Sequence, residues 1–175
     1  MAKLRKMLGV ADSPYIVSLM RLIETQSKNT LANWCIDYTE AHVLPIYEKA
    51  YPSDTRPRDA LDAAREWLKG NIKLPAAKAC ILAAHTAARK AEENPAAQAA
   101  ARAAGQAAAT IHATTHSIGI AFYGAAANAY DRVGLDEKPA VYDQIASEEC
   151  AKMEAALRSV AIPNEPNPAK INWNC

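Results

Sequence analysis

The sequence predicts an all-α protein, and three observations support this. Alanine, leucine, glutamate and lysine recur at helical spacing along most of the 175 residues. No segment alternates apolar and polar residues over enough positions to predict a strand. Proline, glycine and asparagine separate the helical segments from one another. A chain of this length is expected to form a single domain, residues 1–175, as one compact bundle of about six or seven helices with its core over about residues 14–161.

The first two helices are predicted from proline positions and apolar spacing. One has Pro14 in its first turn and buries a single apolar stripe, formed by Ile16, Leu19, Met20 and Ile23. The second runs from about Asn29 to Tyr47. Pro45 is expected to bend or end that second helix, because proline has no N–H to donate and its ring crowds the preceding turn.

The third helix follows the loop "YPSDTRP", residues 51–57. Asp54 or Thr55 is expected to cap this helix, and Gly70 is expected to end it. Arg58 and Arg65 lie on the polar side of its helical pattern. Both arginines are therefore expected to face water.

The second half of the chain is rich in alanine. A fourth helix is expected from about residue 75 to residue 92 or 93, and a fifth over residues 95–113, where eleven of the nineteen residues are alanine. A break within "ATTHS", residues 113–117, separates the fifth helix from a sixth over about residues 115–132. These two helices lack a charged face, so we expect them as a close central pair. A seventh begins at Pro139 and is expected to bury Tyr142, Ile145, Ala146, Cys150, Met153, Leu157 and Val160.

The last segment, "PNEPNPAKINWNC", has three prolines and no helical pattern. Residues 162–175 are therefore expected to form an extended C-terminal arm. Trp173 needs an apolar surface to cover it, either on its own chain, which we favour, or on a second copy.

The charge balance excludes some classes of partner. Lys and Arg number 20 against 19 Asp and Glu, so a net charge of +1 provides no general attraction for nucleic acid or anionic lipid. Residues 103–130 carry no formal charge, but their Gln, Thr, His and Asn side chains argue against a membrane span. The N-terminus has no apolar run of signal-peptide length, and four cysteines with no CxxC pair suit a reducing compartment. We expect a cytoplasmic protein.

Two histidines are candidates for a metal-binding or ligand-binding site. His112 and His116 are four residues apart, the spacing at which two imidazoles on one helical turn can share a metal ion, and His85 could supply a third. No carboxylate lies near them in the sequence, and Arg89 would repel a cation. We therefore expect no metal and no cofactor. Two interpretations stay open: a pocket lined by these histidines and Tyr123, or histidines hydrogen-bonded within a helix interface.

Three longer segments of the sequence resemble a known protein family. The segments "DTRPRDALDAAREWLKG", "AAHTAARKA" and "AARAAGQAAATIHATTHSIGIAFYGAAA" resemble the immunity protein five-like family of bacterial polymorphic toxin systems, and the resemblance runs from about residue 34 to residue 127. The matching polar positions are Asp37, Arg56, His85, Arg89, His112 and His116. Gln106 stands where the family often has histidine.

The resemblance implies a small bacterial protein that binds and neutralises a cognate protein toxin, with no turnover of its own. Candidate contact residues are Asp37, Arg56, Arg58, His85, Arg89, His112, His116 and Tyr123. Two other classes remain: an enzyme or small-molecule-binding protein that uses the His and Tyr face, and a structural module that oligomerises through the C-terminal arm. The sequence lacks the phosphate-binding, dinucleotide-binding and zinc-protease motifs, which makes an enzyme the less favoured class.

Overall fold

The computed structural model describes residues 3–174, and over that range it contains eight α-helices, one 3-10 helix and no strand. The all-α prediction is confirmed, whereas the expected number of about six or seven helices is wrong. In chain order the helices are α1 (Pro14–Ile23), α2 (Lys28–His42), α3 (Leu44–Ala50), α4 (Arg56–Leu68), α5 (Leu74–Lys90), α6 (Pro95–Ala109), the 3-10 helix η1 (Thr114–Ile118), α7 (Gly119–Val133) and α8 (Pro139–Val160).

The additional helix begins beside Pro45. Helix α2 ends at His42, and Val43 leaves helical geometry with a φ of −125°. Pro45 then lies in the first turn of α3, where a missing N–H costs no helical hydrogen bond. Inside one continuous helix the same proline would remove a hydrogen bond, so the single helix predicted over residues 29–47 is two helices.

The predicted fifth helix ends four residues early. Helix α6 stops at Ala109, and η1 separates it from α7, which begins at Gly119. The expected break within residues 113–117 is therefore present. His112 and His116 do not share a continuous α-helix, and their relative position is set by the turn and by η1.

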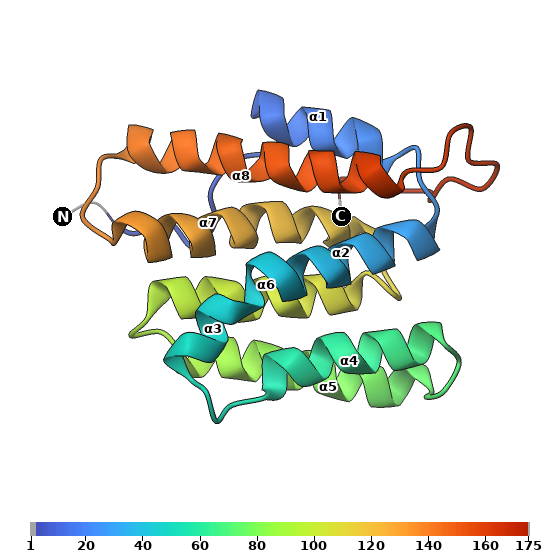
Figure 1. Cartoon of the computed structure of the whole chain (residues 1–175), viewed down its shortest axis with the longest axis horizontal. Helices are drawn as coiled ribbons and strands as arrows, with labels where there is room; N and C mark the ends of the chain where they lie inside the picture. Colours follow the sequence, from blue (N-terminus) through green and yellow to red (C-terminus); the bar gives the residue numbers. More distant parts are fainter. Residues whose placement is uncertain (1–2, 175) are drawn as a thin grey trace.

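The helices run side by side along the long direction of the molecule (Figure 1). Helix α1 packs on α8 at one edge, α7 lies next to α8, and α4 and α5 pair at the opposite edge. Helix α6 lies between these edges and contacts α2, α3, α4, α5 and α7. Eleven of its fifteen residues are buried. Small alanine side chains on almost every side allow these neighbours to approach it.

Helix α8 buries the residues expected of it, with one exception. Tyr142, Ile145, Met153 and Leu157 are buried, but Val160 is 52% exposed and its predicted burial is wrong. Val160 is the last residue of the helix, where the chain turns away into the arm. No helix in the described part of the chain is long and apolar enough to cross a membrane.

The C-terminal arm packs on its own chain, as favoured from the sequence. Gln26, which is 3% exposed, holds it: its side-chain Oε1 accepts a hydrogen bond from Ile162 N at 2.8 Å, and its backbone oxygen accepts one from Ala169 N at 2.8 Å. Farther along, Trp173 donates from Nε1 to Glu24 Oε1 at 2.7 Å. The arm is therefore fastened near the end of α1 at three points.

Candidate functional site

The structure separates the eight candidate residues into two groups. Asp37, Arg56 and Arg58 lie on α2 and at the start of α4, whereas the other five gather around α5, η1 and α7: His85, Arg89, His112, His116 and Tyr123. His112 lies in the turn before η1.

The first group belongs to an ion-pair network that joins α2 and α3 to α4. Arg58 donates to both Glu48 oxygens at 2.8 Å and to Glu40 Oε1 at 3.0 Å. Arg65 donates to Asp37 Oδ1 at 2.9 Å and to Glu40 as well. Hydrogen bonds from Arg65, with smaller contributions from Arg58, hold the pKa of Glu40 below its usual value. The two arginines expected to face water are thus only partly exposed, and carboxylates of their own chain engage both.

Arg56 is engaged in the same way. Its guanidinium donates to Asp54 Oδ1 at 2.8 Å and to Oδ2 at 2.5 Å, and Tyr47 Oη donates to Asp54 Oδ2 at 2.7 Å. Hydrogen bonds from Arg56 hold the pKa of Asp54 far below its usual range. Asp54 also accepts from the Arg56 backbone N–H at 3.2 Å, so it fastens the start of α4, whereas Thr55 makes no side-chain cap.

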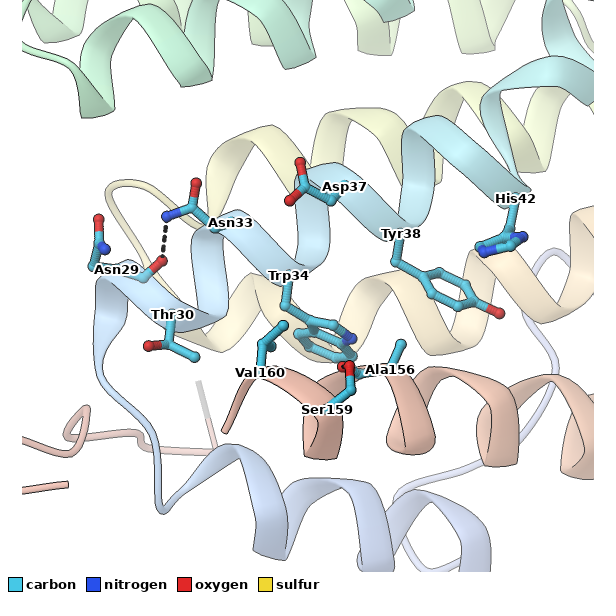
Figure 2. Close-up of a pocket in the computed structure, with 10 residues that line it drawn as sticks. All are labelled: Asn29, Thr30, Asn33, Trp34, Asp37, Tyr38, His42, Ala156, Ser159 and Val160. Carbon is cyan, nitrogen blue, oxygen red and sulfur yellow. Dashed lines mark hydrogen bonds between the residues drawn. The ribbon is translucent and has the colours of Figure 1, made fainter. Parts of the chain in front are cut away.

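A groove of about 410 Å³ lies between α2 and α8 (Figure 2). Trp34 packs toward α8, and its Nε1 donates to Met153 O at 3.1 Å. Along α2, Asn33 donates to Asn29 O at 2.9 Å, and the Asp37 carboxylate points away from the groove, toward α4. The charge of Asp37 is therefore directed to Arg65, and the groove presents mainly amide, hydroxyl and aromatic surface.

The second group is built around close contacts to glycine. His85 lies against Gly105 of α6, where a Cβ would come within 2.5 Å of His85 Cε1. The side chain of Gln106 lies in the same way against Gly119 of α7, where a Cβ would come within 2.6 Å of Gln106 Oε1. A side chain at either glycine would push a polar group out of place. Close contact with a polar side chain thus explains glycine at positions 105 and 119.

Gln106 orients His116. The His116 Nδ1 atom lies 2.8 Å from Gln106 Oε1, and since a carboxamide oxygen only accepts, Nδ1 carries the proton. The other nitrogen, Nε2, is then left as an acceptor on the neutral ring. Burial lowers the pKa of His116, which favours this neutral form near pH 7.

The other two histidines lie close enough to interact with His116. The rings of His112 and His116 are 5.8 Å apart between centroids. Burial, then His116, Arg89 and Arg102 lower the pKa of His85, and burial, then Lys78 and His116 lower that of His112. In the described range no three His, Cys, Asp or Glu side chains are placed to hold one metal ion.

Sequence reasoning missed Arg102. Its guanidinium carbon lies 5.9 Å from the ring centroid of Tyr123, a cation–π distance. Gln98, Arg102 and Gln106 recur every four residues in a segment otherwise made of alanine and glycine, so they mark the side of α6 that is only partly buried. This spacing of polar residues could have predicted from the sequence that Arg102 is accessible.

Beside His116 lies a pocket of about 530 Å³. Its lining includes Gln106, His116, Phe122, Tyr123 and Trp173. The C-terminal arm thus contributes one wall through Trp173, and η1 and α7 contribute most of the others.

The comparison with known families agrees with the resemblance found in the sequence. A family model described as "Imm-5 like putative immunity protein" matches residues 21–156, a range that covers α2 to α7 and most of α8. Neither the curated proteins nor the solved structures include a significant match to the chain. The match covers well over half of the sequence, so the chain belongs to the Imm-5 like family.

Proposed function

We propose that this protein binds a cognate bacterial toxin in the cytoplasm and neutralises it through that contact. The observation that carries the proposal is the family match over residues 21–156. The matched range contains every candidate residue, so the match supports an immunity function for the part of the chain in which they lie. The buried thiols of Cys35 and Cys150 suit a reducing compartment.

We assign the contact to one surface, the histidine–arginine face. It is formed by Lys78, Leu82, His85, Arg89, Arg102, His112 and Tyr123. The first four lie along one side of α5 at spacings of three and four residues, and Leu82 is 66% exposed. Arginine and tyrosine are the residue types that most often carry binding energy at protein interfaces, and Leu82 adds apolar area beside them.

Arg56 and Arg58 are left out of this surface because their guanidiniums are already engaged. Replacing the carboxylates around them with a partner's carboxylates would first break the links between α2, α3 and α4. Asp37 is left out for the same reason, since it points to Arg65.

Co-expression with any toxin-like protein that is encoded beside the gene tests the proposal. The wild-type chain should restore growth, and Arg89→Glu should reduce the rescue at unchanged helical content and melting temperature. Lys138→Glu is the matched control, because Lys138 is an exposed cation on the turn between α7 and α8. Wild-type protein that never restores growth contradicts the function. Full rescue by Arg89→Glu contradicts the choice of surface.

The pocket beside His116 supports a second candidate, a small-molecule-binding protein. It combines about 530 Å³ with an oriented imidazole and three aromatic side chains. Native mass spectrometry of the purified protein separates the two candidates. A bound organic molecule that is lost in His116→Ala would favour this one.

A further inference from the structure

Most arginines in the described part of this protein form ion pairs with carboxylates of the same chain. The described residues contain nine arginines, and seven have a carboxylate within 4.0 Å: Arg5, Arg21, Arg56, Arg58, Arg65, Arg132 and Arg158. In the described range, Arg89 and Arg102 are the two arginines without such a partner, and both line the same pocket. The unpaired guanidiniums are therefore close together on the histidine–arginine face.

The positive charge there extends beyond the arginines. The charged groups that shift the pKa values of His85 and His112 are Lys78, Arg89, Arg102 and His116, and each of them lowers the pKa. Cationic groups from α5 and α6 thus lie around the imidazoles of His85 and His112. The net charge of the whole chain is only +1, so a local excess of positive charge distinguishes this face.

Acids are present at one border of this face. Glu92 and Glu93, on the turn after α5, line a pocket of about 630 Å³ together with Lys6, Arg89 and Arg102. Neither glutamate comes within 4.0 Å of a cationic group in the described part of the chain. Arg5 also lines this pocket, but Asp143 pairs with it at 2.9 Å. Positive groups outnumber negative ones even at this border.

The two free arginines are held in different ways that leave donors available. Arg102 is placed over the Tyr123 ring, which takes up one face of the guanidinium but none of its in-plane N–H groups. Arg89 donates from one terminal nitrogen to Thr86 Oγ1 at 2.7 Å. Guanidinium is a planar five-donor group suited to bidentate carboxylate binding, so both retain the geometry for it.

We infer that the histidine–arginine face binds an acidic surface of the toxin, whose Asp or Glu carboxylates pair with Arg89 and Arg102 beside the imidazole of His85. This inference rests on the proposed function and deepens it by naming the chemistry of the partner. It also accounts for an immunity protein that is not acidic itself, because the charge that steers association then lies on this one face.

The imidazoles give the contact a pH dependence. A carboxylate placed among these groups favours the protonated form of His85 and of its neighbours, so binding takes up protons. Affinity should then rise as the pH falls toward 6, as long as the carboxylates stay ionised. The other charged groups around these imidazoles are Lys78, Arg89 and Arg102, and Glu92 and Glu93 lie at the border of the face.

The first test measures the dissociation constant of the toxin complex in 0.05, 0.15 and 0.5 M salt, each at pH 7.5 and pH 6.0. We expect about tenfold weaker binding across the salt range and tighter binding at the lower pH. The Arg89→Gln, Arg102→Gln double variant should lose most of the salt dependence, and Lys138→Gln should keep it. Binding that ignores salt, or a double variant that behaves like the wild type, overturns the inference and leaves the function standing. A toxin that does not bind at all overturns the function.

A second test needs no toxin. An oligo-glutamate peptide added to the purified chain should shift the ring C–H resonances of His85 and His112 and raise their pKa values, while an oligo-lysine peptide should shift neither. The same double variant should abolish the shifts, and melting curves show that it is folded. Inorganic phosphate that matches the oligo-glutamate effect at equal concentration would contradict a carboxylate-bearing partner and point to a general anion site.

Discussion

His85 and Gly105 lie in direct contact, with the imidazole Cε1 only 2.5 Å from where a Cβ on Gly105 would be. The contact joins α5 to α6 and fixes the imidazole beside Arg102 and His116. The position of the central imidazole on the histidine–arginine face is thus set by the absence of a side chain on the neighbouring helix.

Gly105→Ala should therefore destabilise the protein although alanine is the better helix former. The propensity gain is about 1 kcal/mol, and the crowding of a packed ring costs about 1–3 kcal/mol, so the net loss should reach up to about 2 kcal/mol. Urea unfolding measures it. In a His85→Ala background the sign should reverse, because the ring is gone and only the propensity gain remains. Equal effects of Gly105→Ala in both backgrounds would contradict this account.

Glu40 should be the most sensitive member of the ion-pair network. Glu40→Gln removes the charge that Arg58 and Arg65 share, and its cost is expected at about 1–2 kcal/mol, above that of an isolated exposed pair. Chemical unfolding at low and high salt is the measurement. Lys69→Ala is the control, since the Lys69 side chain is 63% exposed and pairs with the neighbouring Glu66, and it should stay within about 0.5 kcal/mol of wild type.

Stability should fall when the pH drops below about 6.5. The folded-state pKa values of His85, His112 and His116 are lowered, chiefly by burial, so the unfolded chain binds more protons in this window. Melting temperatures between pH 7.5 and pH 5.0 should show a decline that His85→Asn makes shallower. Glu40, Glu48 and Asp54, with lowered pKa values, should add a separate loss only below about pH 4.5. A flat profile from pH 7.5 to 5.0 would be inconsistent with the lowered pKa values of these imidazoles.

Gln26→Ala should loosen the C-terminal arm at its first attachment point, Ile162. The variant loses the side-chain hydrogen bonds to the Ile162 N–H and carbonyl, at a cost of about 1–2 kcal/mol for a buried polar contact. Limited proteolysis should then cut at Lys170 faster, and Trp173 emission should shift to the red. Asn167→Ala, on the exposed part of the arm, should change neither. An arm that stays protected in Gln26→Ala would show that the hydrogen bonds of Ala169 and Trp173 are sufficient to hold it.

The sequence predicted the fold class and most helix starts because these depend on local signals. Pro14 and Pro139 mark helix starts that need no knowledge of the rest of the chain. Pro45 was harder, since the same residue can bend a helix or begin a new one. The choice depends on the packing of α3 against α6.

The candidate site was predicted less evenly. The i, i+4 spacing predicted that His112 and His116 lie close together on one continuous helix. Helix α6 ends before both residues, yet η1 and the turn before it place their rings 5.8 Å apart. The partners of Arg58 could not be read from sequence, because Glu40 is eighteen residues away and Glu48 ten. Arg102 was missed because the alanine-rich helix was treated as buried on all sides.

The packing of α1 on α8 also bears on the order of folding. Helix α1 is the first and α8 the last helix of the described residues, and Ile16, Leu19 and Ile23 of α1 are buried in the finished fold. During synthesis α1 leaves the ribosome before α8, so its apolar side has no access to its main partner until α8 has also emerged. The edge of the bundle that α1 and α8 form is therefore expected to close late, after the helices between them in the sequence have been made.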